Sequence, residues 1–159
     1  MSRAKGRGHK IVCRNKRARF DYKINEVYEA GLVLTGTEVK SLRQGRANLT
    51  DSYARVIDGE VWMLNSHISP YPYAYHGNHD TDRRRKLLLH KREIKKLYGK
   101  TQEKGMSLIP MSIYFKDGKA KVELGLAEGK QVFDKRQAIK KRMADREMAR
   151  ALRQRWESD

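Results

Sequence analysis

The sequence predicts a mainly β protein: an OB-like closed β-barrel with two or three flanking helices and a basic C-terminal tail. Two pairs of alternating apolar segments are each joined by an Asp-Gly turn, at residues 58–59 and 117–118, as in tight hairpins. An apolar strand pattern, a short helix pattern and another strand follow one another between residues 31 and 54. These patterns favour a small barrel of about five or six short strands, one end of which is closed by a helix.

The first strand should begin near Tyr22 and continue through Leu34, because residues 31–35 are apolar and β-branched and Gly36 follows them. Thr37 is then the expected N-cap of a short helix, which Gly45 ends. Val39 and Leu42 lie three residues apart and should face the core. The polar residues of this stretch are expected on the outer side: Glu38, Lys40, Ser41, Arg43 and Arg46.

A hairpin should span Tyr53 to Leu64, with Ile68 in a further strand. The segment from Ser69 to Asp82 is rich in Pro, Gly, Asn and Asp, which predicts a loop. Its tyrosines recur at every second position, and they allow two interpretations. Tyr71, Tyr73 and Tyr75 either pack against the barrel or stack on nucleic-acid bases.

Lys86 to Leu89 should form a short strand, and three consecutive leucines predict burial on both of its faces, so that Leu88 belongs to the core. A helix is expected from about His90 to Lys104. A second hairpin should span Met106 to Ala127. Its alternation points Lys121 outward as a cation on a rigid strand.

The charge indicates a polyanion as the partner, because the 159 residues carry a formal net charge of +17. Residues 1–20 hold eight Lys or Arg and no acid, residues 82–100 hold nine against two acids, and residues 130–159 hold ten against five. We expect a basic flexible arm over residues 1–19, an RNA-binding barrel over residues 20–128, and a basic tail over residues 129–159. The tail has no continuous apolar stripe, so we expect it to become helical when bound; a solvated helix is the alternative.

Cationic side chains next to the tyrosine loop are expected to neutralise phosphates: Arg83, Arg84, Arg85 and Lys86. We predict no catalytic residues, metal site or cofactor, because the acids are scattered among turns and the histidines lack a completed ligand set. The single cysteine, Cys13, indicates a reducing compartment. No apolar run is long enough for a secretory signal or a membrane span, so we expect a cytoplasmic protein.

Five segments in order, at matching spacing, resemble the SsrA-binding protein family, also called small protein B. They are NKRARFDY (15–22), YEAGLVLTGTEVKSLRQGR (28–46), NLTDSYA (48–54), RKLLLHKREI (85–94) and GLAEGKQVFDKR (125–136). The resemblance implies an OB-like barrel that binds the tRNA-like domain of tmRNA. It also implies delivery to stalled 70S ribosomes with elongation factor Tu and alanyl-tmRNA, for ribosome rescue by trans-translation.

The resemblance assigns roles to particular residues. Glu29, Leu88 and Lys121 match the positions that serve the tmRNA surface in that family, so it implies that Leu88 is exposed. Asp134, Lys135 and Arg136, preceded by Phe133, match a tail motif that occupies the decoding centre, beside 16S rRNA, and the empty mRNA channel. Thr81 and Glu128 depart from the family pattern, in which a proline and a basic residue are usual.

The sequence thus favours a non-catalytic RNA-binding protein of trans-translation. One alternative is a basic ribosome-associated structural protein with no preference for tmRNA. A more distant alternative is an RNA-processing enzyme.

Overall fold

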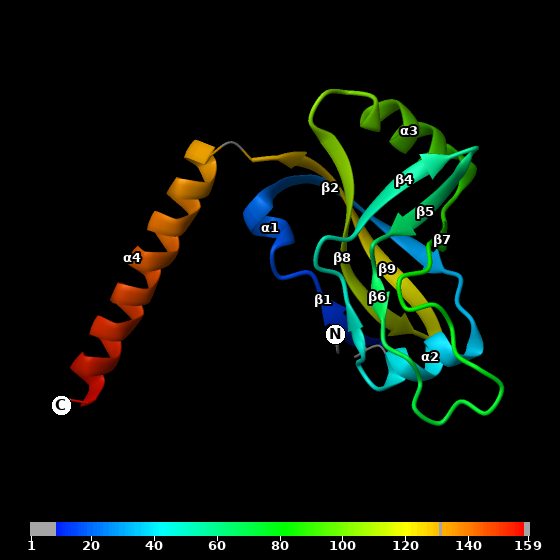
Figure 1. The fold of residues 1–159 in the computed structure, drawn as a ribbon. Helices are drawn as coiled ribbons and strands as arrows, with labels where there is room; N and C mark the ends of the chain where they lie inside the picture. Colours follow the sequence, from blue (N-terminus) through cyan, green and yellow to red (C-terminus); the bar gives the residue numbers. More distant parts are fainter. Residues whose placement is uncertain (1–8, 131, 158–159) are drawn as a thin grey trace, which may run out of the picture. The chain divides into compact units, whose positions relative to one another are not determined.

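The chain divides into two compact units, Met1–Gly129 and Lys130–Asp159, and the computed structural model describes residues 9–130 and 132–157 (Figure 1). The first unit is mainly β with short helices, and the second is one helix. The helices are α1 (Ala18–Asp21), α2 (Gly36–Arg43), α3 (Lys91–Thr101) and α4 (Val132–Glu157). The strands are β1 (His9–Arg14), β2 (Tyr22–Leu32), β3 (Ala47–Asn48), β4 (Tyr53–Ile57), β5 (Glu60–Leu64), β6 (His67–Ile68), β7 (Arg85–Leu88), β8 (Met106–Lys116) and β9 (Lys119–Gly129).

Seven of the described strands form one antiparallel sheet in the order β1-β8-β4-β5-β7-β2-β9. Strand β9 also pairs with β8, so the hydrogen-bonded neighbours lead from β8 through β4, β5, β7, β2 and β9 back to β8. Strands β3 and β6 form a separate pair. The fold is therefore mainly β, as predicted.

Both predicted hairpins are present. Asp58 and Gly59 have φ of 50° and 74°, and Asp117 and Gly118 have φ of 52° and 77°. Positive φ at both central positions matches the right-handed twist of the flanking strands, which is why Asp-Gly marks these turns.

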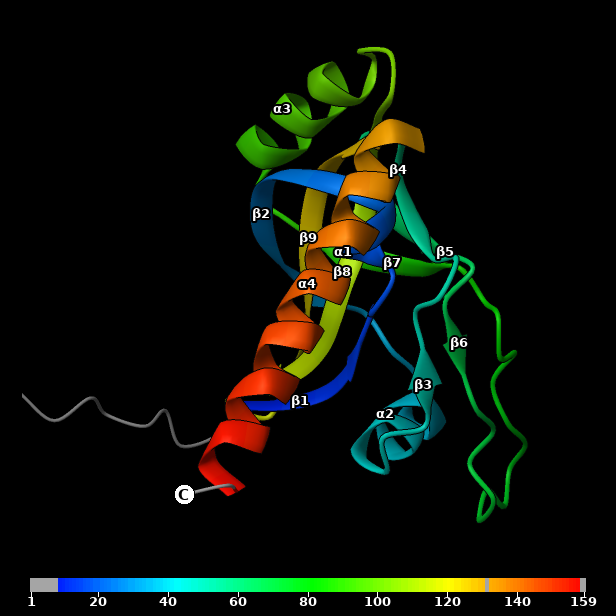
Figure 2. The same cartoon turned by 90° about the vertical axis from the view of Figure 1, so that its left-hand side faces the viewer.

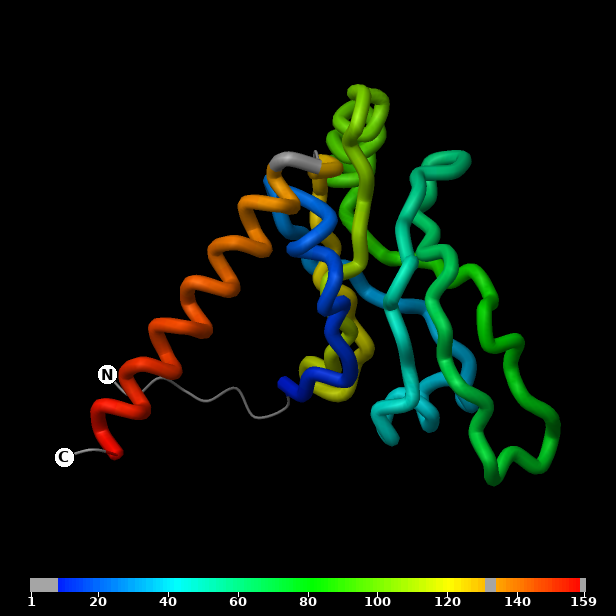
Figure 3. The backbone as a smooth tube through the Cα atoms, turned by 60° about the vertical axis from the view of Figure 1, so that its left-hand side comes forward, coloured from blue at the N-terminus to red at the C-terminus, as the bar shows by residue number. Residues whose placement is uncertain are grey.

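The core of the first unit lies between the sheet, α2 and α3. Leu42 of α2 and Leu97 of α3 are buried among strand residues such as Leu87, Ile113 and Leu124. A smaller cluster gathers around Ala18 and Met111. Helix α3 lies at one end of the unit, whereas α2 and the loop of residues 69–82 lie at the other end (Figures 2 and 3).

Two predictions about α2 are wrong. The helix begins at Gly36 with Thr35, not Thr37, as its N-cap, and the Thr35 N–H donates to Glu38 Oε1 at 2.9 Å. Glu38 and Ser41, expected on the outer side, are fully buried beside Leu42. A buried carboxylate needs compensating donors, and the two charged donors to Glu38, Arg83 and Arg85, lie more than forty positions away, so helical spacing could not predict its burial.

The prediction of a flexible arm over residues 1–19 is wrong for its described part; residues 1–8 lie outside the described residues. Residues 9–14 form β1 and pair with β8. Asn15 then donates through its side-chain amide to the Leu49 and Pro110 carbonyls at 3.2 Å each, and Ala18 is 2% exposed. The short apolar run around Val12 forms this strand. The high density of positive charge around it had favoured the prediction of a flexible arm. Burial raises the pKa of Cys13 in β1, which argues against a reactive thiolate.

Helix α4 runs without a break through most of the second unit. Its large apolar side chains are exposed, from Ile139 at 42% to Trp156 at 82%. The structure therefore has residues 132–157 as a helix. Helix formation coupled to binding stays a prediction.

Candidate nucleic-acid interface

Three side chains that are distant in sequence project from one face of the large sheet. Gly31 of β2 pairs with Leu88 of β7 on one side and with Lys121 of β9 on the other. Glu29 lies two residues from Gly31, so its side chain points to the same face. Because neighbouring strands are about 4.8 Å apart, the backbones of Leu88 and Lys121 lie roughly 10 Å apart across Gly31. The structure therefore brings together the three residues that the resemblance singled out.

Gly31 lets Leu88 approach β2 closely. A Cβ added to Gly31 would lie 3.2 Å from the Cβ of Leu88. Leu88 is 53% exposed, whereas Leu87 is 1% exposed. The placement of Leu88 in the core is thus wrong, and the exposure implied by the resemblance is present. Sequence analysis missed Gly31, although a glycine within a strand is itself a signal of close approach.

Glu29 is held in a network on this face. Tyr114 of β8 donates from its hydroxyl to Glu29 Oε2 at 2.5 Å, and Lys116 Nζ lies 3.4 Å from Oε1. The Tyr114 hydrogen bond, then the Lys116 contact and the charge of Lys121, lower the pKa of Glu29 despite some desolvation. Burial, and then the neighbouring carboxylate, raises the pKa of Tyr114. Glu29 is therefore an ionised acceptor at neutral pH, and Tyr114 is a second residue that sequence analysis missed.

A groove of about 540 Å³ opens beside Glu29, between strands β1, β2, β8 and β9. Apolar side chains contribute part of its lining, including Ile11 and Val27, which are 40% and 51% exposed. The ring of His9 meets that of Tyr114 edge-on, with the centroids 4.8 Å apart. The groove lining combines two carboxylates, Glu29 and Glu123, with one cation at Lys116, apolar surface and ring edges, which suits the hydroxyl groups of riboses and the amino groups of bases.

The basic block at residues 83–86 does not act as one patch. Arg85 is fully buried and donates from Nε to Glu38 Oε2 at 2.5 Å and from Nη1 to the Ser66 carbonyl at 2.9 Å. The prediction that Arg85 contacts RNA is therefore wrong, because its guanidinium supports the interior. Arg83, whose side chain is 35% exposed, donates from Nη2 to Glu38 Oε1 at 2.5 Å.

The other two cations of this block remain near the surface. The guanidinium of Arg84 lies 4.4 Å from the centroid of the Trp62 ring, and Lys86 Nζ lies 2.9 Å from Glu60 Oε1. The Lys86 and Glu60 side chains are 36% and 45% exposed. A surface pair of this kind is weak, so Lys86 can exchange Glu60 for a phosphate.

Glu38 is the shared acceptor of two guanidinium groups. Burial by itself would raise the pKa of Glu38, but the Thr35 N–H, Arg83 and Arg85 outweigh burial and lower it. Burial also lowers the pKa of Arg85, against the opposing effect of Glu38. Glu38 therefore stays ionised in the interior and ties α2 to β7.

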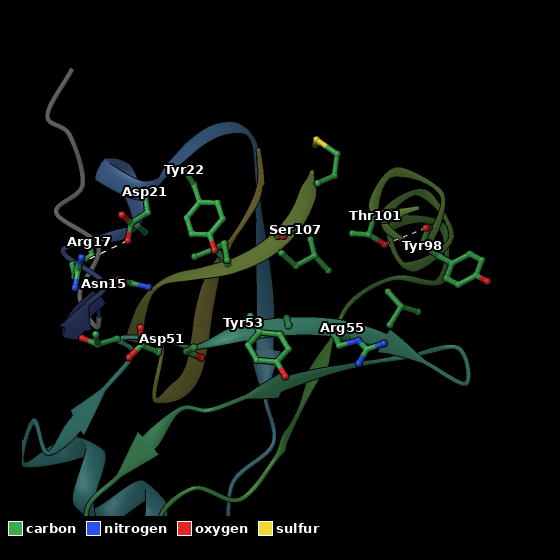
Figure 4. Close-up of a pocket in the computed structure, with 18 of the residues that line it drawn as sticks. Asn15, Arg17, Asp21, Tyr22, Asp51, Tyr53, Arg55, Tyr98, Thr101 and Ser107 are labelled. Atoms are coloured by element: carbon green, nitrogen blue, oxygen red, sulfur yellow. Dashed lines mark hydrogen bonds and ion pairs between the residues drawn. The ribbon is translucent and has the colours of Figure 1, made fainter. Parts of the chain in front are cut away.

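A second hollow, of about 560 Å³, lies between α1, β4, β8 and α3 (Figure 4). Its charged lining side chains are Arg17, Asp21, Asp51 and Arg55, two cations and two carboxylates. Arg17 and Asp21 pair at 3.8 Å. With no excess of positive charge, this hollow does not extend the candidate interface.

The histidines of the tyrosine loop are engaged in hydrogen bonds or exposed, and residues 9–130 and 132–157 contain no group of three or more His, Cys, Asp or Glu placed to hold a metal. His79 contacts Thr37 Oγ1 through Nδ1 and the Ile68 carbonyl through Nε2, both at 2.9 Å. None of the helices in the described part of the chain is long and apolar enough to cross a membrane.

The tail motif lies in the first turns of α4. Asp134 and Arg136 are exposed and Lys135 is partly exposed. The side chain of Phe133 lies outside the described residues. Their role stays a prediction.

Comparison with known proteins bears on this interface. A family model described as SmpB protein matches residues 12–154. The SsrA-binding protein of Geobacter metallireducens is 59% identical over 151 residues, which cover 95% of this chain and 99% of that protein. The SsrA-binding protein of Desulforudis audaxviator is 61% identical over 144 residues, which cover 91% and 94%. A solved structure described as "tmRNA-SmpB: a journey to the center of the bacterial ribosome" is 50% identical, with a TM-score of 0.65, and covers 80% of this chain and 93% of that chain.

Proposed function

Because the chain belongs to the SmpB protein family, we propose that it binds tmRNA and acts with it in the rescue of stalled ribosomes. The observation that carries the proposal is the convergence of Leu88, Lys121 and Glu29 around Gly31 on one sheet face. The charge of +17 supplies the long-range attraction to RNA. The protein acts by binding, in the cytoplasm, and needs no catalysis or cofactor.

The sheet face around Gly31 is the proposed contact with the tRNA-like domain. Lys121 neutralises a phosphate, and Leu88 packs against a ribose or base. Glu29, held ionised by Tyr114, accepts from a ribose hydroxyl or a base amino group. Arg84 and Lys86 extend the contact along the phosphate backbone of the RNA.

The ring of strand pairings supports an OB-like closed barrel as the body that carries this face. The barrel is proposed for residues 20–128. Residues 9–18 extend it through β1 and the Asn15 hydrogen bonds.

The tail is proposed to enter the decoding centre and the empty mRNA channel. Asp134, Lys135 and Arg136 would contact 16S rRNA there, with Phe133 stacking nearby. Elongation factor Tu with alanyl-tmRNA would be the delivery partner.

Removal of residues 130–159 tests the role of the tail. The truncation leaves β9 complete to Gly129, so the truncated protein should keep its tmRNA affinity but fail to support peptide tagging on stalled ribosomes. Normal tagging would reject the role of the tail.

The central test is a binding comparison. The affinity for the tRNA-like domain of tmRNA is measured against an unrelated structured RNA of equal length, at the same salt concentration, because salt alone changes such affinities by orders of magnitude. A clear preference for the tRNA-like domain is expected. Equal affinities would instead indicate a basic ribosome-associated protein without tmRNA specificity.

A further inference from the structure

The loop of residues 69–82 is held in one conformation by its own hydrogen bonds. The side chain of Asn78 links the two ends of the loop's central part. Its Oδ1 accepts from the Tyr71 N–H and its Nδ2 donates to the Tyr71 carbonyl, both at 2.9 Å. Gly77, with φ of 91°, makes the turn that brings Asn78 back to Tyr71. Residues 71–78 thus form a closed sub-loop without any helix or strand.

Two further side chains attach the base of this sub-loop to the body. His79 joins Thr37 of α2 to the carbonyl of Ile68 in β6. The buried Arg85 donates from Nη2 to the carbonyls of Asp80 and Thr81 at 3.3 and 3.1 Å. The sub-loop is therefore positioned before any partner arrives.

What this scaffold presents is aromatic surface. Tyr73 is 69% exposed and Tyr75 is 95% exposed, so the interpretation that the tyrosines pack against the barrel is wrong for both. Tyr71 meets Tyr73 in a T-shaped contact with the centroids 5.7 Å apart. Rings left this exposed add little to folding, because burial of apolar surface is what stabilises.

Positive charge adjoins these rings. Lys40 Nζ of α2 lies 5.4 Å from the centroid of the Tyr71 ring, and Arg43 and Arg46 are exposed farther along the same segment. The loop's two carboxylates sit at its base, where Asp80 accepts from the Asp82 N–H and Asp82 contacts His67. The sub-loop therefore offers two exposed rings, Tyr73 and Tyr75, and a third ring, Tyr71, that lies beside a cation of α2, which is complementary to a nucleic acid.

We propose that the sub-loop of residues 71–78 is a stacking platform for unpaired bases of the tmRNA, an inference that rests on the function proposed above. Unpaired bases are required because paired bases hide their faces in the helix, whereas the largely exposed rings of Tyr73 and Tyr75 need a base that is free to stack. Gly36 at the start of α2 is five positions after Gly31, a span of at most about 18 Å. Because Lys40 of the same helix lies 5.4 Å from the Tyr71 ring, an RNA bound on the Glu29 face has only a short distance to extend to this platform, which favours tmRNA over a separate ribosomal RNA.

The test uses the full chain and full-length tmRNA. The double variant Tyr73→Ala/Tyr75→Ala should bind about tenfold more weakly for each ring that stacks. Tyr73→Phe/Tyr75→Phe keeps the rings and should bind like the wild type. Tyr98→Ala removes a tyrosine of α3 that is also exposed, at 54%, and serves as the matched control without loss of affinity.

Salt dependence separates stacking from charge. The tyrosine variants should leave the slope of log affinity against log salt unchanged, whereas Lys40→Ala should reduce its magnitude by somewhat less than one. A fully paired RNA of equal length should bind the wild type and the double alanine variant alike.

Wild-type binding to tmRNA with no loss in the double alanine variant would overturn the platform and leave the proposed function intact. An equal loss in the phenylalanine variant would replace stacking by hydroxyl hydrogen bonds, and an equal loss in Tyr98→Ala would show a nonspecific effect; either overturns the inference. Failure of the wild type to prefer tmRNA would reject the proposed function itself. A loss confined to ribosomes without tmRNA would assign the platform to ribosomal RNA and overturn the choice of partner.

Discussion

Replacement of Glu38 by alanine should destabilise the first unit more than any surface substitution. Glu38 and Arg85 are each 0% exposed, and their side chains meet at 2.5 Å. Glu38→Ala leaves the Arg85 charge in the interior without its carboxylate, and also removes the partner of Arg83. Breaking one side of a buried ion pair costs about 3–5 kcal/mol. At roughly 3–5 °C per kcal/mol for a unit of this size, the melting temperature should fall by about 9–25 °C.

The pH dependence gives a second measurement of the same pair. The pKa of Glu38 is lower in the folded state than its ordinary value of 4.5. Its contribution to stability is therefore complete above about pH 4.5 and is lost as the pH falls through the lower, folded-state pKa. Glu38→Gln, which removes the charge but keeps the shape, should make the free energy of unfolding less dependent on pH in this acidic range.

Glu60→Ala is the matched control, because Glu60 pairs with the partly exposed Lys86 on the surface. Its cost should be about 0–1 kcal/mol. Both variants are compared by thermal and urea unfolding. A loss below about 1 kcal/mol for Glu38→Ala would refute the reasoning, since an uncompensated guanidinium cannot be that inexpensive in the interior.

Two substitutions probe the sheet face. Lys121→Ala should weaken tmRNA binding and lower the salt dependence by about one phosphate contact while leaving thermal stability nearly unchanged, as filter binding and melting curves would show; a large loss of stability would contradict its outward position. Gly31→Ala places a Cβ 3.2 Å from Leu88 Cβ, so Leu88 must shift and tmRNA affinity should fall several-fold, with a stability loss of about 1 kcal/mol. Unchanged affinity, measured beside Gly99→Ala as a control with no atom within 4 Å of the added Cβ, would show that the position of Leu88 is unimportant.

The sequence predicted those features that depend on local chemistry. The two Asp-Gly turns specify their hairpins because few residue types adopt positive φ at a low cost in free energy, and Asp and Gly are among them. The strand period that points Lys121 outward points Val122, Leu124 and Leu126 to the opposite side, and all three are buried.

The sequence failed where a distant partner decides the outcome. Glu38 is buried because it pairs with Arg83 and Arg85, which follow the loop of residues 69–82 in the sequence. Hydropathy alone places a glutamate on the surface. Leu88 is exposed because it adjoins Gly31 on the outer side of the sheet, whereas a run of leucines by itself predicts burial. The resemblance implied that Leu88 is exposed, whereas hydropathy alone did not.

The buried ion pair of Glu38 and Arg85 holds in place the elements that carry the proposed RNA contacts. Arg85 is the residue before Lys86 in β7, and β7 also carries Leu88 beside Gly31. The same guanidinium holds the carbonyls of Asp80 and Thr81 at the base of the tyrosine loop, and its partner Glu38 belongs to the helix that carries Lys40. A charge pair that an apolar pair could replace at little cost in stability thus fixes a strand, a helix and a loop relative to one another. Preorganisation reduces the entropy lost on binding, so this pair should matter to RNA affinity as well as to folding.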